Sequence, residues 1–204
     1  MITLVIETAT AACSVALLNG PEPVALRHEL VGRGHAERLV PMIGEVLAAA
    51  GGVVPGAVLV DCGPGSFTGI RVGLAAARAF GLAWNVEVSG FSALAAIAAA
   101  GGGGQPCAVA MTGGHGELFV QRFAGDPLQP LAEVRSLPPA EAAMMVPDER
   151  VLGSGAAALV AARGIGRAED RLPSAADAAL LPTALVGLPP RPLYGRPPDA
   201  VVPR

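Results

Sequence analysis

Apolar and polar positions alternate near the start of the chain. Ile2, Leu4 and Ile6 alternate with Thr3, Val5 and Glu7, a second run of this kind passes through residues 15–17, and PVALRHEL forms a third. A period of two is typical of β-strands that expose one face. We therefore expect an antiparallel meander of three strands at the amino end.

The pattern then changes to the spacing of a helix. Over residues 35–50 apolar side chains recur three, four and seven positions apart, which predicts a helix with one apolar face. Pro41 is expected to kink this helix or to restart its first turn. The continuous apolar run 57–62 lies between two glycines and predicts a strand buried on both faces, followed by a helix over 68–83.

A partial repeat of this order follows in the second half of the chain. A short strand at 86–88 and an alanine-rich helix at 92–100 precede the glycine tract 101–104, which is interpreted as a loop or lobe boundary. The expected elements after it are three strands, a helix, a strand with its turn, and a helix, at CAVAMTG, GELFVQRF, LAEVRSL, PAEAAMM, RVLGSG and AAALVAA. This order indicates a weak internal duplication and two lobes, residues 1–100 and 105–204.

The last residues are rich in proline. The segment PPRPLYGRPPDAVVPR cannot form a helix or a central strand, so an extended tail is expected, either loose or laid over another surface.

Composition narrows the class of protein. The chain has 204 residues and a formal net charge of −3, and all 14 basic residues are arginine, so no basic stripe for a nucleic-acid backbone is present. Three cysteines far apart in apolar runs suggest buried reduced thiols and a cytoplasmic protein. The amino end lacks the basic start of a signal peptide, and the uncharged stretch 88–114 is broken by glycines, so no membrane span is expected.

The glycine-rich stretch GPGSFTGIRVG, residues 63–73, has three possible roles. A strand that runs into a glycine turn and a helix start can bind a phosphate, but the phosphate-binding loop of nucleotide hydrolases needs a lysine after its last glycine. Here Gly69 is followed by Ile70 and Arg71. A nucleophile elbow needs glycines two positions before and after Ser66, and Pro64 and Thr68 stand there instead.

The third role is structural. Gly69, Gly73, Ala77 and Gly81 recur every four residues and form a ridge without bulk, which lets a neighbour approach closely. That neighbour is either the protein's own sheet or a partner chain, and periodicity does not decide between them. The two predicted helices could pair with two helices of another protomer as a four-helix interface. The residues assigned to this interface are Leu39, Ile43, Val46, Gly69, Gly73 and Ala77.

Candidate metal ligands are sparse. His28, His35 and His115 form no pair with the spacing of a zinc site, and surface or hydrogen-bonding roles are expected for them. Glu7 at the tip of the first hairpin could bind a hydrated metal and a phosphate, but no opposing carboxylate is evident, so no metal site is predicted. The candidates for a vestigial phosphate loop are Glu7, Thr8, Thr10, Gly65, Ser66 and Thr68.

Several of these stretches resemble one protein family. IETATAACSVAL, HAERLVPMI, GPGSFTGIRVG, GELF, LGSG and PLYGR follow one another nearly end to end as in the TsaB family, also called YeaZ, and GPGSFTGIRVG is the most specific. The resemblance implies an α/β fold of the two-lobed actin, sugar kinase and Hsp70-like type, with a ribonuclease H-like core in each lobe. This agrees with the duplicated order of elements.

The resemblance also implies a function. TsaB proteins are regarded as noncatalytic subunits that pair with TsaD, joined by the ATPase TsaE, in the synthesis of N6-threonylcarbamoyladenosine at position 37 of tRNA. We expect no cofactor, contact with tRNA only through the complex, and a homodimer when the partner is absent. Glu7 and Thr112-Gly113-Gly114 stand where many relatives have Asp and Asp-Ala-Arg, which weakens any case for nucleotide or metal binding.

The alternative is an enzyme, either a glycoprotease-like metallopeptidase or an ATP-binding transferase. The missing histidine pair argues against the first, and the absent lysine and the solitary Glu7 argue against the second. If the assigned interface is correct, Gly73→Glu should abolish pairing with TsaD and leave the monomer folded.

Overall fold

The first half of the chain builds a five-stranded sheet. The structure is a computed structural model that describes residues 1–195. The strand order is β3-β2-β1-β4-β5, with β1 antiparallel to β2 and parallel to β4. Because β2 is also antiparallel to β3, the predicted antiparallel meander of three strands is confirmed. The elements are β1 (Ile2–Glu7), β2 (Ala12–Asn19), β3 (Glu22–Leu30), α1 (His35–Ala49), β4 (Ala57–Asp61), α2 (Phe67–Trp84), β5 (Glu87–Phe91) and α3 (Ala93–Gly102).

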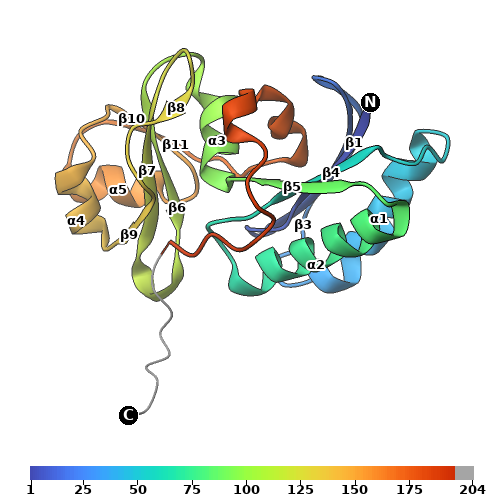
Figure 1. Cartoon of the computed structure of the whole chain (residues 1–204). Coiled ribbons are helices and arrows are strands. Elements are labelled where there is room, and N and C mark those ends of the chain that lie inside the picture. Colours follow the sequence, from blue (N-terminus) through green and yellow to red (C-terminus); the bar gives the residue numbers. More distant parts are fainter. Residues whose placement is uncertain (196–204) are drawn as a thin grey trace, which may run out of the picture.

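The two faces of this sheet are covered by different elements. Helices α1 and α2 lie side by side on one face (Figure 1), where Leu4 and Ile6 of β1 pack in one cluster with Ile43 of α1 and Leu74 of α2. On the other face Val5 belongs to a cluster with residues of α3 and of the 3₁₀ helix η2 (Ala175–Leu180). Strands buried on both faces lose the alternation of apolar and polar residues, as the sequence of β4 shows.

The second half repeats the topology of the first. Its central strands follow the order β11-β10-β6-β7, with β8 and β9 both paired to the outer edge of β7. The antiparallel pair β6–β7 and the parallel pairs β6–β10 and β10–β11 match the pairs β1–β2, β1–β4 and β4–β5 of the first sheet. The elements are β6 (Cys107–Thr112), η1 (Gly114–Gly116), β7 (Leu118–Ala124), β8 (Gln129–Pro130), β9 (Arg135–Leu137), α4 (Pro139–Met145), β10 (Arg150–Leu152), α5 (Ala156–Arg163) and β11 (Arg167–Glu169).

Helix α3 lies between the two sheets. It contacts η2 on the side of the first sheet and β6, β7 and β10 of the second. Almost all of its residues are buried, including Leu94 and Ile97, because other elements cover the helix on all sides. Its sequence accordingly has no polar face. Its alanines allow close approach on both sides, and Gly101 faces the side chain of Leu152.

Two predicted elements differ from the structure. Helix α1 continues through Pro41 without a restart, because Pro41 lies on the exposed face, where water can bond the carbonyl that loses its partner. Of the strand predicted at LAEVRSL, only residues 135–137 form β9, since the side chains of Leu131 and Glu133 are exposed and no ladder continues through them.

The last elements return to the first sheet. After β11, η2 packs against β2, β3 and α3, and η3 (Thr183–Leu185) follows it. The chain then runs past β5 toward the second sheet (Figure 1), and Leu188 pairs with Gly90. The described part of the proline-rich segment, 189–195, thus lies over the protein's own surface, and residues 196–204 lie outside the described residues.

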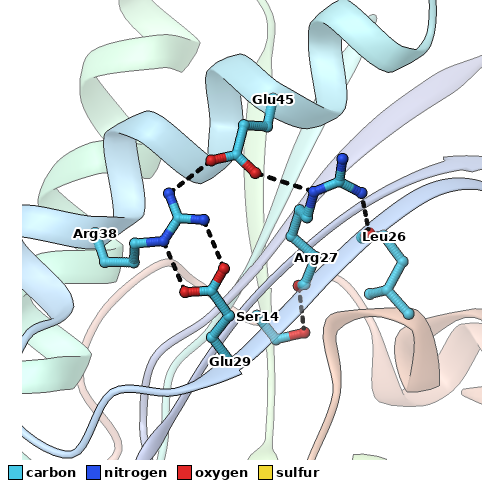
Figure 2. A network of polar contacts seen from close by, with 6 residues as sticks. All are labelled: Ser14, Leu26, Arg27, Glu29, Arg38 and Glu45. Atoms are coloured by element: carbon cyan, nitrogen blue, oxygen red, sulfur yellow. Dashed lines mark hydrogen bonds and ion pairs between the residues drawn. The ribbon is translucent and has the colours of Figure 1, made fainter.

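An ion-pair network joins the edge strand β3 to α1 (Figure 2). Arg38 of α1 binds Glu29 of β3 and Glu45 of its own helix, at 2.5 and 2.7 Å. Arg27 of β3 donates from Nε to Glu45 at 3.0 Å. The guanidinium of Arg38 lowers the pKa of Glu29 and of Glu45 through these hydrogen bonds. The four charges of this network, those of Arg27, Glu29, Arg38 and Glu45, thereby neutralise one another.

Within residues 1–195, no helix has both the length and the apolar character that a membrane crossing requires. The three cysteines are free and buried, as predicted.

Candidate functional site

The glycine loop connects the end of β4 to the start of α2, as predicted. Gly63 has φ of +99°, a conformation that glycine adopts without strain. Ser66 is the N-cap of α2, and its hydroxyl accepts a hydrogen bond from the Gly69 N–H at 3.2 Å. The loop is therefore a strand-to-helix turn with a capped helix.

The turn after β1 packs directly on this loop. The Ser66 N–H donates to the Ala9 carbonyl at 2.7 Å, and the Thr8 hydroxyl donates to the Gly69 carbonyl at 2.8 Å. A Cβ at Gly65 would collide with the Ala9 carbonyl, and a Cβ at Gly69 would collide with the Thr8 carbonyl. These glycines are required because two backbones touch, and the space of a phosphate cradle is filled by the protein itself.

The ridge of small residues on α2 also faces inward. A Cβ at Gly73 would collide with the Thr8 hydroxyl, and one at Gly81 would collide with the Val88 side chain. Ala77 is completely buried. The close neighbour of α2 is therefore the sheet of its own chain, which was one of the two possibilities that the periodicity left open.

The predicted partner interface is consequently wrong in its residues. All six residues assigned to it are buried inside the chain, namely Leu39, Ile43, Val46, Gly69, Gly73 and Ala77. The physical reason is that an apolar or small-residue stripe marks the face that a helix buries, and in α1 and α2 that face covers the sheet. A surface for a partner has to be sought on the opposite faces of these helices.

Two carboxylates meet at the ends of neighbouring strands. Glu7 ends β1 and Asp61 ends β4, and the parallel register that pairs Ile6 with Val60 brings them next to one another. Both are fully buried. One oxygen of each accepts a backbone N–H, from Ala9 at 2.7 Å and from Gly63 at 2.6 Å.

The other oxygen of each carboxylate, Oε2 of Glu7 and Oδ2 of Asp61, has no hydrogen-bond partner among the described residues. Glu7 was predicted from the sequence as a candidate residue of this site, and Asp61 was not. The available signal was an acidic residue directly after a buried parallel strand, where the carboxyl ends of neighbouring strands meet.

Burial changes the acidity of this pair. It raises the pKa of Asp61 to about 8, and burial together with the charge of Asp61 raises the pKa of Glu7 well above its usual value. The pKa of the nearby Asp177 in η2 is also raised by burial. At neutral pH the pair therefore retains at least one proton.

The pair does not fit a metal or nucleotide site. Both carboxylates are closed off from solvent, and the turn that contains Thr8 and Ala9 packs against the loop where phosphates would lie. No group of three metal-ligating side chains occurs in residues 1–195. The remaining vestigial-loop candidates are distributed around the turn: Thr10 accepts the Ala12 N–H at 3.2 Å, and Ser66 and Thr68 are exposed.

Comparisons with known proteins show which family the chain belongs to. The family model described as TsaD, tRNA N6-adenosine threonylcarbamoyltransferase, matches residues 28–157. "tRNA threonylcarbamoyladenosine biosynthesis protein TsaB" of Escherichia coli is 39% identical over 97 residues, 47% of this chain and 42% of that protein. YeaZ from Pseudomonas aeruginosa is 27% identical, with a TM-score of 0.77 over 88% of this chain and 89% of that one. The chain belongs to the TsaD family, in its TsaB (YeaZ) group.

The TsaB protein of Haemophilus influenzae is 42% identical to this chain over 102 residues, 48% of this chain and 42% of that protein. In both curated TsaB relatives the match spans less than half of the relative's length. An activator of 2-hydroxyisocaproyl-CoA dehydratase from Clostridium difficile shares only 10% identity but reaches a TM-score of 0.51 over 89% of this chain. Together with the repeated strand order, these likenesses confirm the predicted two-lobed fold.

This TsaB-group chain exposes apolar side chains on the outer faces of α1 and α2. Val40 of α1 is 56% exposed, and Phe67 and Leu82 of α2 are 56% and 85% exposed. The two helices contact one another, so their outer faces adjoin. The exposed residues on these outer faces include Ala36, Glu37, Val40, Pro41, Gly44 and Ala48 of α1 and Phe67, Arg71, Ala75, Arg78 and Leu82 of α2.

Proposed function

We propose that the chain is a noncatalytic subunit of the machinery that makes N6-threonylcarbamoyladenosine at position 37 of tRNA, and that it acts by binding TsaD. Support comes from membership of the TsaB group, whose curated relatives carry the name of this modification. The observation that carries the proposal is the outer face of α1 and α2, where Val40, Phe67 and Leu82 remain largely exposed within the described residues.

The burial of the chain's candidate catalytic carboxylates supports a noncatalytic role. Glu7 and Asp61 are the only fully buried carboxylates of the described residues, and both lie behind the turn that packs on the glycine loop. A catalytic acid or base has to come within hydrogen-bond reach of a substrate. The chain thus contributes binding free energy to the complex, and chemistry belongs to its partner.

The outer face has the character of a docking surface. It combines large apolar side chains with small ones such as Gly44 and Ala75, over which another helix pair can pack closely. Stable protein interfaces bury about 1,600 Å² in total. Two helices from each partner provide a surface of this class, so the four-helix geometry of the original hypothesis is retained with the outward residues in place of the inward ones.

Further associations follow from the same proposal. TsaE joins the pair, tRNA is contacted only through the complex, and the isolated chain forms a twofold homodimer through the same face, because contiguous apolar patches are rarely left in water. Sedimentation at several concentrations tests the last point. A monomer at every concentration would contradict it.

The central experiment is reconstitution of adenosine modification with and without this chain. We expect the modification to be lost when the chain is omitted and absent when the chain is alone. Val40→Asp combined with Leu82→Asp should abolish TsaD binding and modification while the melting temperature stays unchanged, since both side chains are exposed.

Ile165→Asp is the matched control, because Ile165 is 72% exposed but lies in the turn after α5, away from α1 and α2. Equal binding of the double variant and this control would contradict the proposed surface. Micromolar binding of Mg-ATP to the isolated chain, measured by calorimetry, would favour the enzymatic alternative instead.

A further inference from the structure

The outer face of α2 carries positive charge that forms no ion pair within residues 1–195. Helix α2 contains Arg71 and Arg78 and no acidic residue. The segment 186–195 that runs alongside it adds Arg191 and likewise contains no acid. By contrast, Arg27 and Arg38 at the edge of the first sheet are ion-paired within the chain (Figure 2).

Arg71 is held in place by the ring of Phe67 and the hydroxyl of Tyr194. Its guanidinium carbon lies 3.6 Å from the centroid of the Phe67 ring, and Nη2 donates to the Tyr194 hydroxyl at 3.2 Å. The Phe67 and Tyr194 rings are stacked, with centroids 5.8 Å apart. Such cation–π contacts orient an arginine before any partner arrives, so little side-chain entropy is lost on binding.

Tyr194 is positioned by the segment that carries it. The Leu193 N–H donates to the Cys62 carbonyl at 2.7 Å, and Arg78 Nη2 donates to the Pro190 carbonyl at 2.5 Å. The segment 186–195 is therefore fixed both to the end of β4 and to the middle of α2. Through it, the carboxyl-terminal part of the chain supplies a side chain to the outer face of α2.

The donors of Arg71 point to the chemistry of its partner. A guanidinium has five N–H donors in a planar fork that matches a carboxylate. One donor binds Tyr194, and Arg71 has no ion pair with a carboxylate of the described residues. A carboxylate from outside can therefore bind the remaining donors.

We propose that Phe67, Arg71 and Tyr194 form an anchor that binds an acidic side chain on the protein that docks on α1 and α2. The inference rests on the proposed function, because it takes TsaD as that protein. A protein partner is favoured over RNA because the exposed apolar side chain of Leu82 lies on the same face of α2, about three turns further along the helix. A surface that binds a phosphate backbone would need many more cations than this helix face offers.

The test measures the Kd for TsaD at increasing NaCl concentration. Arg71→Gln should weaken binding about 30-fold or more at low salt and flatten the salt dependence, because it removes a charge that becomes desolvated at the interface. Arg71→Lys keeps the charge but loses the planar fork, so it should recover only part of the affinity. Tyr194→Phe keeps the stacked ring and removes the hydroxyl that orients Arg71, and an intermediate loss is expected.

Arg167→Gln is the matched control, since Arg167 is exposed on β11 in the other lobe. The proposal is overturned if Arg71→Gln binds TsaD as tightly as this control does. It is also overturned if Arg71→Gln leaves TsaD binding intact and instead removes an affinity of the isolated chain for tRNA. If the parent chain does not bind TsaD at all, the proposed function itself fails. If the parent chain binds TsaD and Arg71→Gln binds equally well, only the anchor fails.

Discussion

Replacing Asp61 by asparagine should change how the stability of the protein depends on pH. Asp61 is fully buried, and burial raises its pKa to about 8. In an unfolded chain the pKa of an aspartate is about 3.9. Between these two values the native protein holds a proton that the unfolded chain has released. The free energy of unfolding of the parent chain therefore falls as pH rises through this window.

The magnitude follows from the width of the window. One proton bound only by the native state changes the free energy of unfolding by about 1.4 kcal/mol for each pH unit. From pH 5 to pH 8 the contribution of Asp61 is a loss of about 3 to 4 kcal/mol. Asparagine is neutral throughout and removes this loss, while the amide oxygen can still accept the Gly63 N–H. The pKa of Glu7 is also raised, so in both proteins Glu7 makes the free energy of unfolding fall as the pH rises.

The assay is urea unfolding at pH 5, 6, 7 and 8, followed by the fluorescence of the single tryptophan, Trp84. The stability of Asp61→Asn relative to the parent should rise across this range by the amount above. Asp170→Asn, at an exposed position, is the control and should parallel the parent. If Asp61→Asn also parallels the parent, Asp61 is ionised in the native protein and the reasoning from burial is refuted.

Other substitutions test the packing of the helices. Gly69→Ala should lower the free energy of unfolding by about 1 to 3 kcal/mol or more, because its Cβ meets a backbone carbonyl, whereas Gly44→Ala, with open space around it, should raise it by about 0.5 to 1 kcal/mol. Asn85→Ala should cost about 1 kcal/mol in urea unfolding, since φ is 53° there, and Asn85→Gly should not. Arg38→Gln should cause a small loss of melting temperature that disappears at 1 M NaCl.

The earlier expectation for Gly73→Glu is corrected by the same packing. Gly73 faces the Thr8 hydroxyl inside the chain, so a glutamate there should prevent correct folding rather than selectively abolish pairing. Circular dichroism of the purified variant separates the two outcomes. A variant with a native melting temperature would contradict the inward orientation of this ridge.

Much of the fold could be predicted because its signals are local. Alternation at Ile2, Leu4 and Ile6 indicated the first strand, and the repeated order of strands and helices indicated two related lobes. The misplaced strand at LAEVRSL shows the limit of such signals. A short edge strand is defined by its pairing with β7, and no local pattern in residues 131–137 specifies where that pairing begins.

The site was less predictable because it depends on contacts between distant segments. The spacing of Gly69 and Gly73 indicated a close neighbour correctly, but only the position of Thr8 shows that the neighbour is the chain's own first turn. Asp61 became a partner of Glu7 through the pairing of β1 with β4, which are far apart in sequence. The aromatic anchor likewise needs Tyr194 to contact α2, and no pattern near Tyr194 in the sequence predicts that contact.

The return of η2 to the first sheet has a consequence for biosynthesis. Ala175 and Ala178 share a buried cluster with Val5, Leu59 and Phe91, which leave the ribosome much earlier. Until η2 emerges, that side of the nascent sheet has apolar residues without their native cover. Completion of the first lobe must therefore wait until η2 has been translated, and a ribosome that stalls after Glu169 would release a product suited to capture by chaperones.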